Sequence, residues 1–168
     1  INGEIDSPTI GQFESMEQEI DFNVLYSSAM DMLSPLSVVN LTLRAAQQVY
    51  ELTGVSPDEI DLFMCNDFFL ASEIVSAEEC GYIPRGEAWR YAIDGRTAYD
   101  GDKPINPHGG RCNFGHAHGA SGIADIYECV KQMRGEAGAT QMVKRPDTTF
   151  VRGFGGSQNV RCQILRAV

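Results

Sequence analysis

NPHGGRCNFGHAHGASG, residues 106–122, is the most informative segment of this chain. It holds His116 between glycines, immediately before a run in which apolar residues recur at helical spacing. Glycines at 109, 110, 115 and 119 permit tight turns and a close approach of the backbone to a ligand or another loop. Because an imidazole between such glycines is poorly placed for core packing, we expect His116 to face a cleft.

The region that follows this segment predicts one helix and two strands. Residues 119–133 have the pattern of an amphipathic helix, with apolar side chains at Ala120, Ile123, Ala124, Tyr127, Val130 and Met133. Two β-rich runs close the chain, at 148–152 and 160–165, with glycines 153, 155 and 156 between them. We therefore predict a terminal antiparallel hairpin.

The patterns before residue 106 predict further helices and one strand. Ser34 and Pro35 have the pattern of a helix start, and Gly54 has that of a helix end. Residues 60–65, IDLFMC, are typical of a short buried strand. The next predicted regions are a helix over 69–80, a helix over 84–92 and a long structured loop over 94–115. Strands that alternate with helices indicate an α/β layered domain over residues 33–168, after a loop-rich lead-in over 1–32.

The composition restricts what the chain binds and where it works. A formal charge of −10, without a cluster of Lys and Arg, argues against nucleic acid. The apolar runs are far shorter than the ~20 residues that span a bilayer, and the polar first residues do not have a signal-peptide pattern. The five cysteines (65, 80, 112, 129 and 162) include no C-x-x-C pair, which indicates a reducing compartment without disulfides or a zinc site. We expect a cytoplasmic protein with no bound metal and no membrane span.

Three separated segments resemble thiolases, in the order and at the approximate spacing of that family. The first follows the thiolase histidine loop N-x-x-G-G-x-x-x-x-G-H-x-x-G-x-[ST]-G at Asn106, Gly109, Gly110, Gly115, His116, Gly119, Ser121 and Gly122. The second, residues 66–69 (NDFF), is similar to the family's N-E-A-F loop, which reads H-D-C-F in thiolases related to sterol carrier protein x. The third, residues 153–157 (GFGGS), takes the place of the C-x-G-G-G segment. The resemblance extends over about residues 34–166, is strongest to the sterol-carrier-protein-x branch, and covers only the C-terminal half of a thiolase.

The resemblance implies a fold and a set of partners. The fold is a βαβαβαββ half, with a five-stranded mixed sheet and helices on its faces. The nucleophilic cysteine belongs to the N-terminal thiolase half, on the same or a separate chain, so we expect a homo- or hetero-oligomer built on a dimer of thiolase folds. Some thiolase-like retro-aldolases also use a small zinc-ribbon/OB-fold subunit. The substrate implied is a coenzyme A thioester, with no permanently bound cofactor.

The resemblance also assigns roles to particular residues. His116 is implied to activate the nucleophile and to donate to the oxyanion, and Asn66 to hold the water of the oxyanion hole. Backbone N–H groups around Gly155 and Gly156 are implied to form a second oxyanion hole. This is acyl transfer at a thioester, by thiolysis or Claisen condensation, as in the acetyl-CoA acetyltransferases of lipid metabolism. The structural alternatives are a loop histidine at 116, a helix cap at Asn66 and a plain hairpin turn over 153–156.

Two positions depart from the thiolase pattern. The family's second catalytic cysteine falls at Phe68 or Gly153 here, and neither residue can move a proton. General acid–base help of ~10²–10⁴-fold therefore needs another residue or different chemistry. Cys112 and His118 flank His116 and are the local candidates, with an inert small residue and a surface residue as their alternatives. Retro-aldol cleavage, a non-catalytic subunit that binds acyl-CoA or a partner, and an isolated α/β module for another small ligand remain open.

Overall fold

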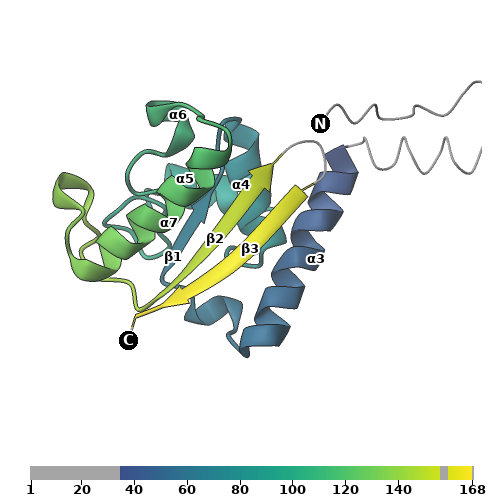
Figure 1. Ribbon diagram of the computed structural model, residues 1–168, viewed down its shortest axis with the longest axis horizontal. Helices are drawn as coiled ribbons and strands as arrows, with labels where there is room; N and C mark the ends of the chain where they lie inside the picture. Colours follow the sequence, from purple (N-terminus) through teal and green to yellow (C-terminus); the bar gives the residue numbers. More distant parts are fainter. Residues whose placement is uncertain (1–34, 156–158, 168) are drawn as a thin grey trace, which may run out of the picture. The chain divides into compact units, whose positions relative to one another are not determined.

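The computed structural model describes residues 35–155 and 159–167 of the chain (Figure 1). The predictions for the lead-in, for the helix start at Ser34 and for Gly156 lie outside these residues. None of the described helices is long and apolar enough to cross a membrane.

The described strands form one mixed sheet in the order β1–β2–β3. β1 (Leu62–Cys65) runs parallel to β2 (Thr148–Gly155), and β3 (Asn159–Arg166) returns antiparallel to β2, which confirms the buried strand and the hairpin. The predicted turn begins too early: Gly153 pairs with Arg161 in the β2–β3 ladder, so β2 continues to Gly155. Within the described residues the sheet has three strands rather than the expected five. Ile105 adds only a single parallel bridge to Phe63 at the other edge of β1.

Helices cover both faces of this sheet (Figure 1). On one face, Phe63 and Phe150 pack against residues of α3 (Pro35–Thr53), α4 (Leu70–Glu79) and α5 (Ala88–Ile93). On the other face, Leu62 and Val151 pack against α7 (Gly119–Arg134). β1 is therefore buried on both sides, as its uninterrupted apolar run predicts.

The helix positions agree with the sequence patterns except at two places. α5 begins at Ala88 rather than at residue 84, because Gly86 has a positive φ of 82° that a helix cannot contain. The long loop over 94–115 ends in a short helix, α6 (Gly110–Phe114). Two 3₁₀ turns lie in other connections, η1 (Pro57–Glu59) and η2 (Gly138–Thr140).

α7 packs on the sheet through its polar side. Its buried residues are Ser121, Asp125, Glu128, Cys129 and Gln132. The polar side chain of Gln132 can be buried because it donates to the carbonyl of Thr140 and accepts from the N–H of Met142. The apolar stripe faces away: Ile123 is 71% exposed and Tyr127 is 64% exposed. An apolar helix face that this part of the chain leaves uncovered needs another surface to pack against.

Candidate active site

Asn66 follows β1 directly and is held in one orientation. Its Oδ1 accepts the backbone N–H of Phe68 at 3.3 Å, and its backbone carbonyl accepts the Ser72 hydroxyl at 2.8 Å. Its Nδ2 lies 3.3 Å from Nδ1 of His116. The N-cap position of α4 belongs to Phe69, so Asn66 is not the cap of that helix.

The contact between Asn66 and His116 determines where the imidazole carries its proton. Because Oδ1 of Asn66 already accepts from Phe68, the amide N–H₂ group faces His116, and that group can only donate. Nδ1 of His116 therefore accepts, and the proton of the neutral ring lies on Nε2. In this state His116 offers a hydrogen-bond donor at Nε2 rather than a base.

Asp67 joins the histidine segment, residues 106–122, to the loop after β1. Its Oδ1 accepts the backbone N–H of Arg111 at 2.5 Å, and its carbonyl accepts the Cys112 thiol at 2.9 Å. This approach requires glycine at 110, where φ is 66° and a Cβ would overlap the Asp67 carboxylate. The two loops that carry Asn66 and His116 are thus joined to each other.

Two further residues, Arg111 and Asn106, anchor the histidine segment through polar contacts. The Arg111 guanidinium forms a buried ion pair with Asp125 of α7. Asn106 accepts the N–H of Cys65 at 3.0 Å and donates to the Glu73 carboxyl at 3.1 Å. Burial raises the pKa of Glu73.

The sequence patterns assign no role to Arg111, Asp125 or Glu73. A signal was present, since an arginine in a glycine-rich segment and an aspartate in the following helix are a pair of opposite charges. Their separation of 14 positions hides the pairing, which depends on the turn between α6 and α7.

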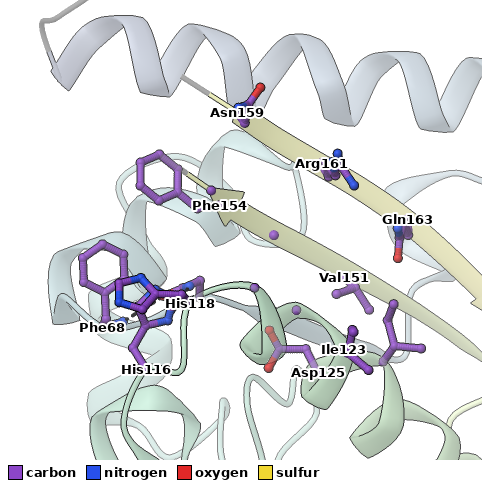
Figure 2. A pocket seen from close by; sticks show the side chains of 16 residues that line it. Phe68, His116, His118, Ile123, Asp125, Val151, Phe154, Asn159, Arg161 and Gln163 are labelled. Atoms are coloured by element: carbon purple, nitrogen blue, oxygen red, sulfur yellow. Dashed lines mark hydrogen bonds between the residues drawn. The ribbon is translucent and has the colours of Figure 1, made fainter. Parts of the chain in front are cut away.

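His118 stands before α7 in a backbone conformation that favours glycine. Its φ of 47° and ψ of −118° match the first central position of a type II′ turn. Such a conformation costs roughly 1–3 kcal/mol and is found mainly at functional sites. The His118 ring lies 5.3 Å from the His116 ring, with the two planes tilted by 59°. Figure 2 shows the two imidazoles beside each other.

A cavity of about 690 Å³ opens between α7 and the β2–β3 hairpin (Figure 2). Asn66, His116, His118 and Gly155 all line it, so the structure brings these four predicted residues to one cavity. The rest of the wall is mixed, with apolar Ile123, Ile126 and Val151 and polar Asn159, Arg161 and Gln163.

Cys112, the other candidate for proton transfer, does not line this cavity. Its thiol donates to the Asp67 carbonyl, and desolvation together with the Asp67 charge raises the pKa of the thiol. All five cysteines are free. Within the described ranges no group of three or more His, Cys, Asp or Glu side chains could hold a metal ion.

Aromatic rings surround the positions where thiolases carry their second cysteine. Phe68 stacks on His116, with ring centroids 5.2 Å apart and planes 17° apart. The Phe154 ring lies 6.1 Å from that of Phe68. Gly153, the other cysteine position, lines the cavity beside Phe154. Neither Phe68 nor Gly153 offers an exchangeable side-chain proton.

Comparison with known proteins shows the family to which the chain belongs. The profile of the family described as "Thiolase C-terminal domain-like" matches residues 24–165. The chain belongs to this family. The resemblance predicted from three short segments, including that to sterol carrier proteins, is therefore confirmed.

Relatives of this thiolase C-terminal domain are much longer than the chain. The acetyl-CoA acetyltransferase of Methanothermobacter thermautotrophicus is 38% identical over 119 residues, which are 71% of this chain and 31% of the relative. The benzoylsuccinyl-CoA thiolase subunit BbsB of Thauera aromatica is 32% identical over 73% of this chain and 32% of its own length. Human sterol carrier protein 2 is 36% identical over 61% of this chain and 19% of its own. The chain thus spans a third or less of these relatives.

A solved structure titled "Ltp2-ChsH2(DUF35) aldolase" is similar in fold. The TM-score is 0.63 and the identity 27%, over 75% of this chain and 31% of the other. The mixed α/β fold of this thiolase C-terminal domain is accordingly shared with part of that structure.

Proposed function

We propose that this chain is the C-terminal catalytic half of a thiolase-like enzyme that acts at the thioester of an acyl-CoA. The observation that carries the proposal is the Asn66–His116 pair, which opens onto the same cavity as Gly155. Coenzyme A enters as part of the substrate, and acyl transfer at its thioester needs no permanently bound cofactor.

The chemistry follows from the donor at His116. Thiolysis and Claisen condensation pass through intermediates in which the thioester oxygen becomes negative. The amide of Asn66 fixes the His116 ring with its proton on Nε2 before substrate arrives. A donor that is oriented in advance stabilises the developing oxyanion, and loss of one such donor costs ~10²–10³-fold in kcat. Backbone N–H groups around Gly155 and Gly156 are the proposed second set of donors.

The nucleophile has to come from outside the described wall of the cavity, which contains no cysteine. We assign it to an N-terminal thiolase half, on the same or a separate chain, within a homo- or hetero-oligomer. The exposed apolar stripe of α7, with Ile123 and Tyr127, supports this partner because it needs an apolar surface to cover it. The surface that contacts the partner would lie beside the cavity, since Ile123 is part of the exposed stripe and also lines the cavity.

A retro-aldolase is the second candidate, and Phe68 and Gly153 favour it. Retro-aldol cleavage deprotonates a β-hydroxyl group rather than a thiol, so its proton demands differ from those that the missing cysteine meets in thiolysis. The similar structure whose title names an aldolase and a DUF35 chain supports this reading and a zinc-ribbon/OB-fold partner. The products separate the two reactions, because thiolysis consumes free coenzyme A while retro-aldol cleavage releases a carbonyl compound without it.

The test uses the complete protein that contains this chain, incubated with acyl-CoA substrates with and without free coenzyme A. We expect His116→Ala and Asn66→Ala to reduce turnover by ~10²–10³-fold. Asn113→Ala is the matched control, because Asn113 is exposed on α6 and does not line the cavity. Unchanged turnover in His116→Ala favours a non-catalytic subunit that binds acyl-CoA or a partner protein.

A further inference from the structure

The cavity needs a group that moves a proton, and its described wall offers few. The titratable side chains that line it are His116, His118, Asp125 and Arg161. The Arg161 guanidinium carries only hydrogen-bond donors and no acceptor, so it cannot act as a base. Asp125 is 1% exposed and its Oδ1 pairs with Arg111, while its Oδ2 has no hydrogen-bond partner within the described residues. Protonation of this carboxylate would break a buried ion pair, so we do not assign it as the base.

His116 is also excluded as the base, because both of its ring nitrogens already have a role. Its Nδ1 accepts from Asn66, so its remaining nitrogen carries the proton and serves as a donor. A group that holds the thioester oxygen through Nε2–H cannot take a proton through the same nitrogen. The base at this cavity is therefore a different side chain.

We propose that His118 is the catalytic acid/base of this site, in place of the second cysteine that Phe68 and Gly153 have replaced. The inference rests on the proposed function, since it assigns a role at the same thioester. His118 lines the cavity, and its ring lies 5.3 Å from that of His116 (Figure 2). The His118 backbone has a φ of 47°, a conformation that glycine adopts more easily than histidine. The chain nevertheless places an imidazole at this position beside the cavity. Imidazole is the side chain best suited to exchange protons near neutral pH.

The step is an enolisation that conserves all atoms and electrons. A neutral His118 nitrogen takes a proton from Cα of the acyl group. The electron pair of the broken C–H bond forms the Cα=C bond, and the thioester oxygen becomes the enolate oxygen, held by Nε2–H of His116. The reverse transfer from the His118 imidazolium to Cα regenerates the acyl-CoA. The same proton transfer to Cα completes the C–C cleavage step of thiolysis, after which coenzyme A takes the acyl group from the nucleophile, and it also completes retro-aldol cleavage.

The experiment measures exchange of Cα hydrogen for deuterium in acetyl-CoA and octanoyl-CoA, incubated in D₂O with the complete protein. His118→Asn is the main variant, because asparagine tolerates a positive φ but cannot relay a proton. We expect its exchange rate to fall by ~10²–10⁴-fold, while acyl-CoA binding and the melting temperature stay at wild-type values. In His118→Gly, which suits this backbone, added imidazole should restore part of the exchange.

Two results would overturn the assignment, and they distinguish failure of the role of His118 from failure of the proposed function. If the wild type exchanges Cα hydrogen and His118→Asn does so at an equal rate, the proposed function stands and the role of His118 is wrong. If the wild type neither exchanges Cα hydrogen nor turns over any acyl-CoA, the proposed function fails, and the inference fails with it.

Discussion

The Asn66 amide donates to Nδ1 of His116 across a separation of 50 positions in the chain. The contact exists because Asp67, next to Asn66, binds the backbone of Arg111 in the histidine segment. The orientation of the Asn66 amide thereby sets the tautomer of the His116 imidazole on another loop. Asn66 consequently acts at the candidate site through His116 as well as through any water that it holds.

Asn66→Asp tests this relationship with almost no change in shape. A carboxylate can only accept, so Nδ1 of His116 must then donate, and Nε2 of the neutral ring becomes an acceptor. We expect turnover in the complete protein to fall by ~10²–10³-fold, because the oxyanion loses its donor. ¹⁵N NMR of the labelled histidine should report the proton on Nε2 in the wild type. A ring that keeps the same tautomer in both proteins contradicts the interpretation.

The ion pair between Arg111 and Asp125 should be critical for stability because it is buried. Side-chain exposure is 6% for Arg111 and 1% for Asp125, so Asp125→Asn leaves a buried charge unpaired. We expect a loss of about 3–5 kcal/mol in the free energy of unfolding, measured with denaturant. The control is Lys144→Met, which breaks an ion pair with Asp61 whose lysine is 80% exposed, and it should cost less than about 1 kcal/mol. Equal losses in the two variants are incompatible with this account.

Gly110→Ala should separate the two loops of the site. Alanine at a positive φ costs roughly 1–2 kcal/mol by itself. At position 110 the new Cβ also overlaps the Asp67 carboxylate, and the lost hydrogen bond to Arg111 adds about 1–3 kcal/mol. Gly138→Ala is the control, since φ is 64° there and no atom lies within 4 Å of the new Cβ. Unfolding free energies that do not differ between the two variants argue against a close approach of Asp67.

Ile123→Glu tests the exposed stripe of α7. Because Ile123 is 71% exposed, we expect the unfolding free energy of the chain to change by no more than about 0.5 kcal/mol. Self-association of this chain and its assembly with an N-terminal half should both decrease, as measured by light scattering and by co-purification. Ile93→Glu, on α5 and 76% exposed, is the control and should assemble like the wild type. Normal assembly of Ile123→Glu places the interface elsewhere.

His108 should make the fold sensitive to acid. Burial lowers the pKa of His108 from its usual 6.5, and its ring stacks on Phe114. The unfolded chain then binds the proton more tightly than the folded chain, so stability falls as the pH decreases through about 6.5. Glu128 opposes this shift and Arg111 reinforces it. His108→Phe keeps the stacking and should flatten this part of the stability profile, measured with denaturant at several pH values. A profile as steep as that of the wild type assigns the acid sensitivity to other groups.

Local patterns were sufficient to predict most of the fold. The apolar run 60–65, the glycine stop at 54 and the two closing β-rich runs each depend on neighbours in the sequence, and each was confirmed. The orientation of α7 could not be found in this way. Periodicity identifies which side of a helix is apolar, but the sheet buries the polar side here, through the pairing of Asp125 and the hydrogen bonds of Gln132.

The sequence predicted which residues lie together at the candidate cavity, and their catalytic roles stay predictions; the electrostatics of the cavity could not be predicted. Motif positions identified Asn66, His116 and Gly155, which line one cavity. The ion pair of Arg111 with Asp125 and the tautomer of His116 depend on contacts between separate segments, so spacing alone does not reveal them. The position of His118 beside His116 depends on its unusual backbone conformation, which a sequence pattern does not specify.

The carbonyl stretch of a bound acyl-CoA tests the central assignment most directly. Infrared difference spectra of the complete protein with [1-¹³C]acetyl-CoA report hydrogen bonding to the thioester oxygen. We predict a shift to lower frequency on binding to the wild type, and its loss in His116→Ala although the ligand still binds. A stretch that is identical in the two proteins would show that His116 does not hold this oxygen.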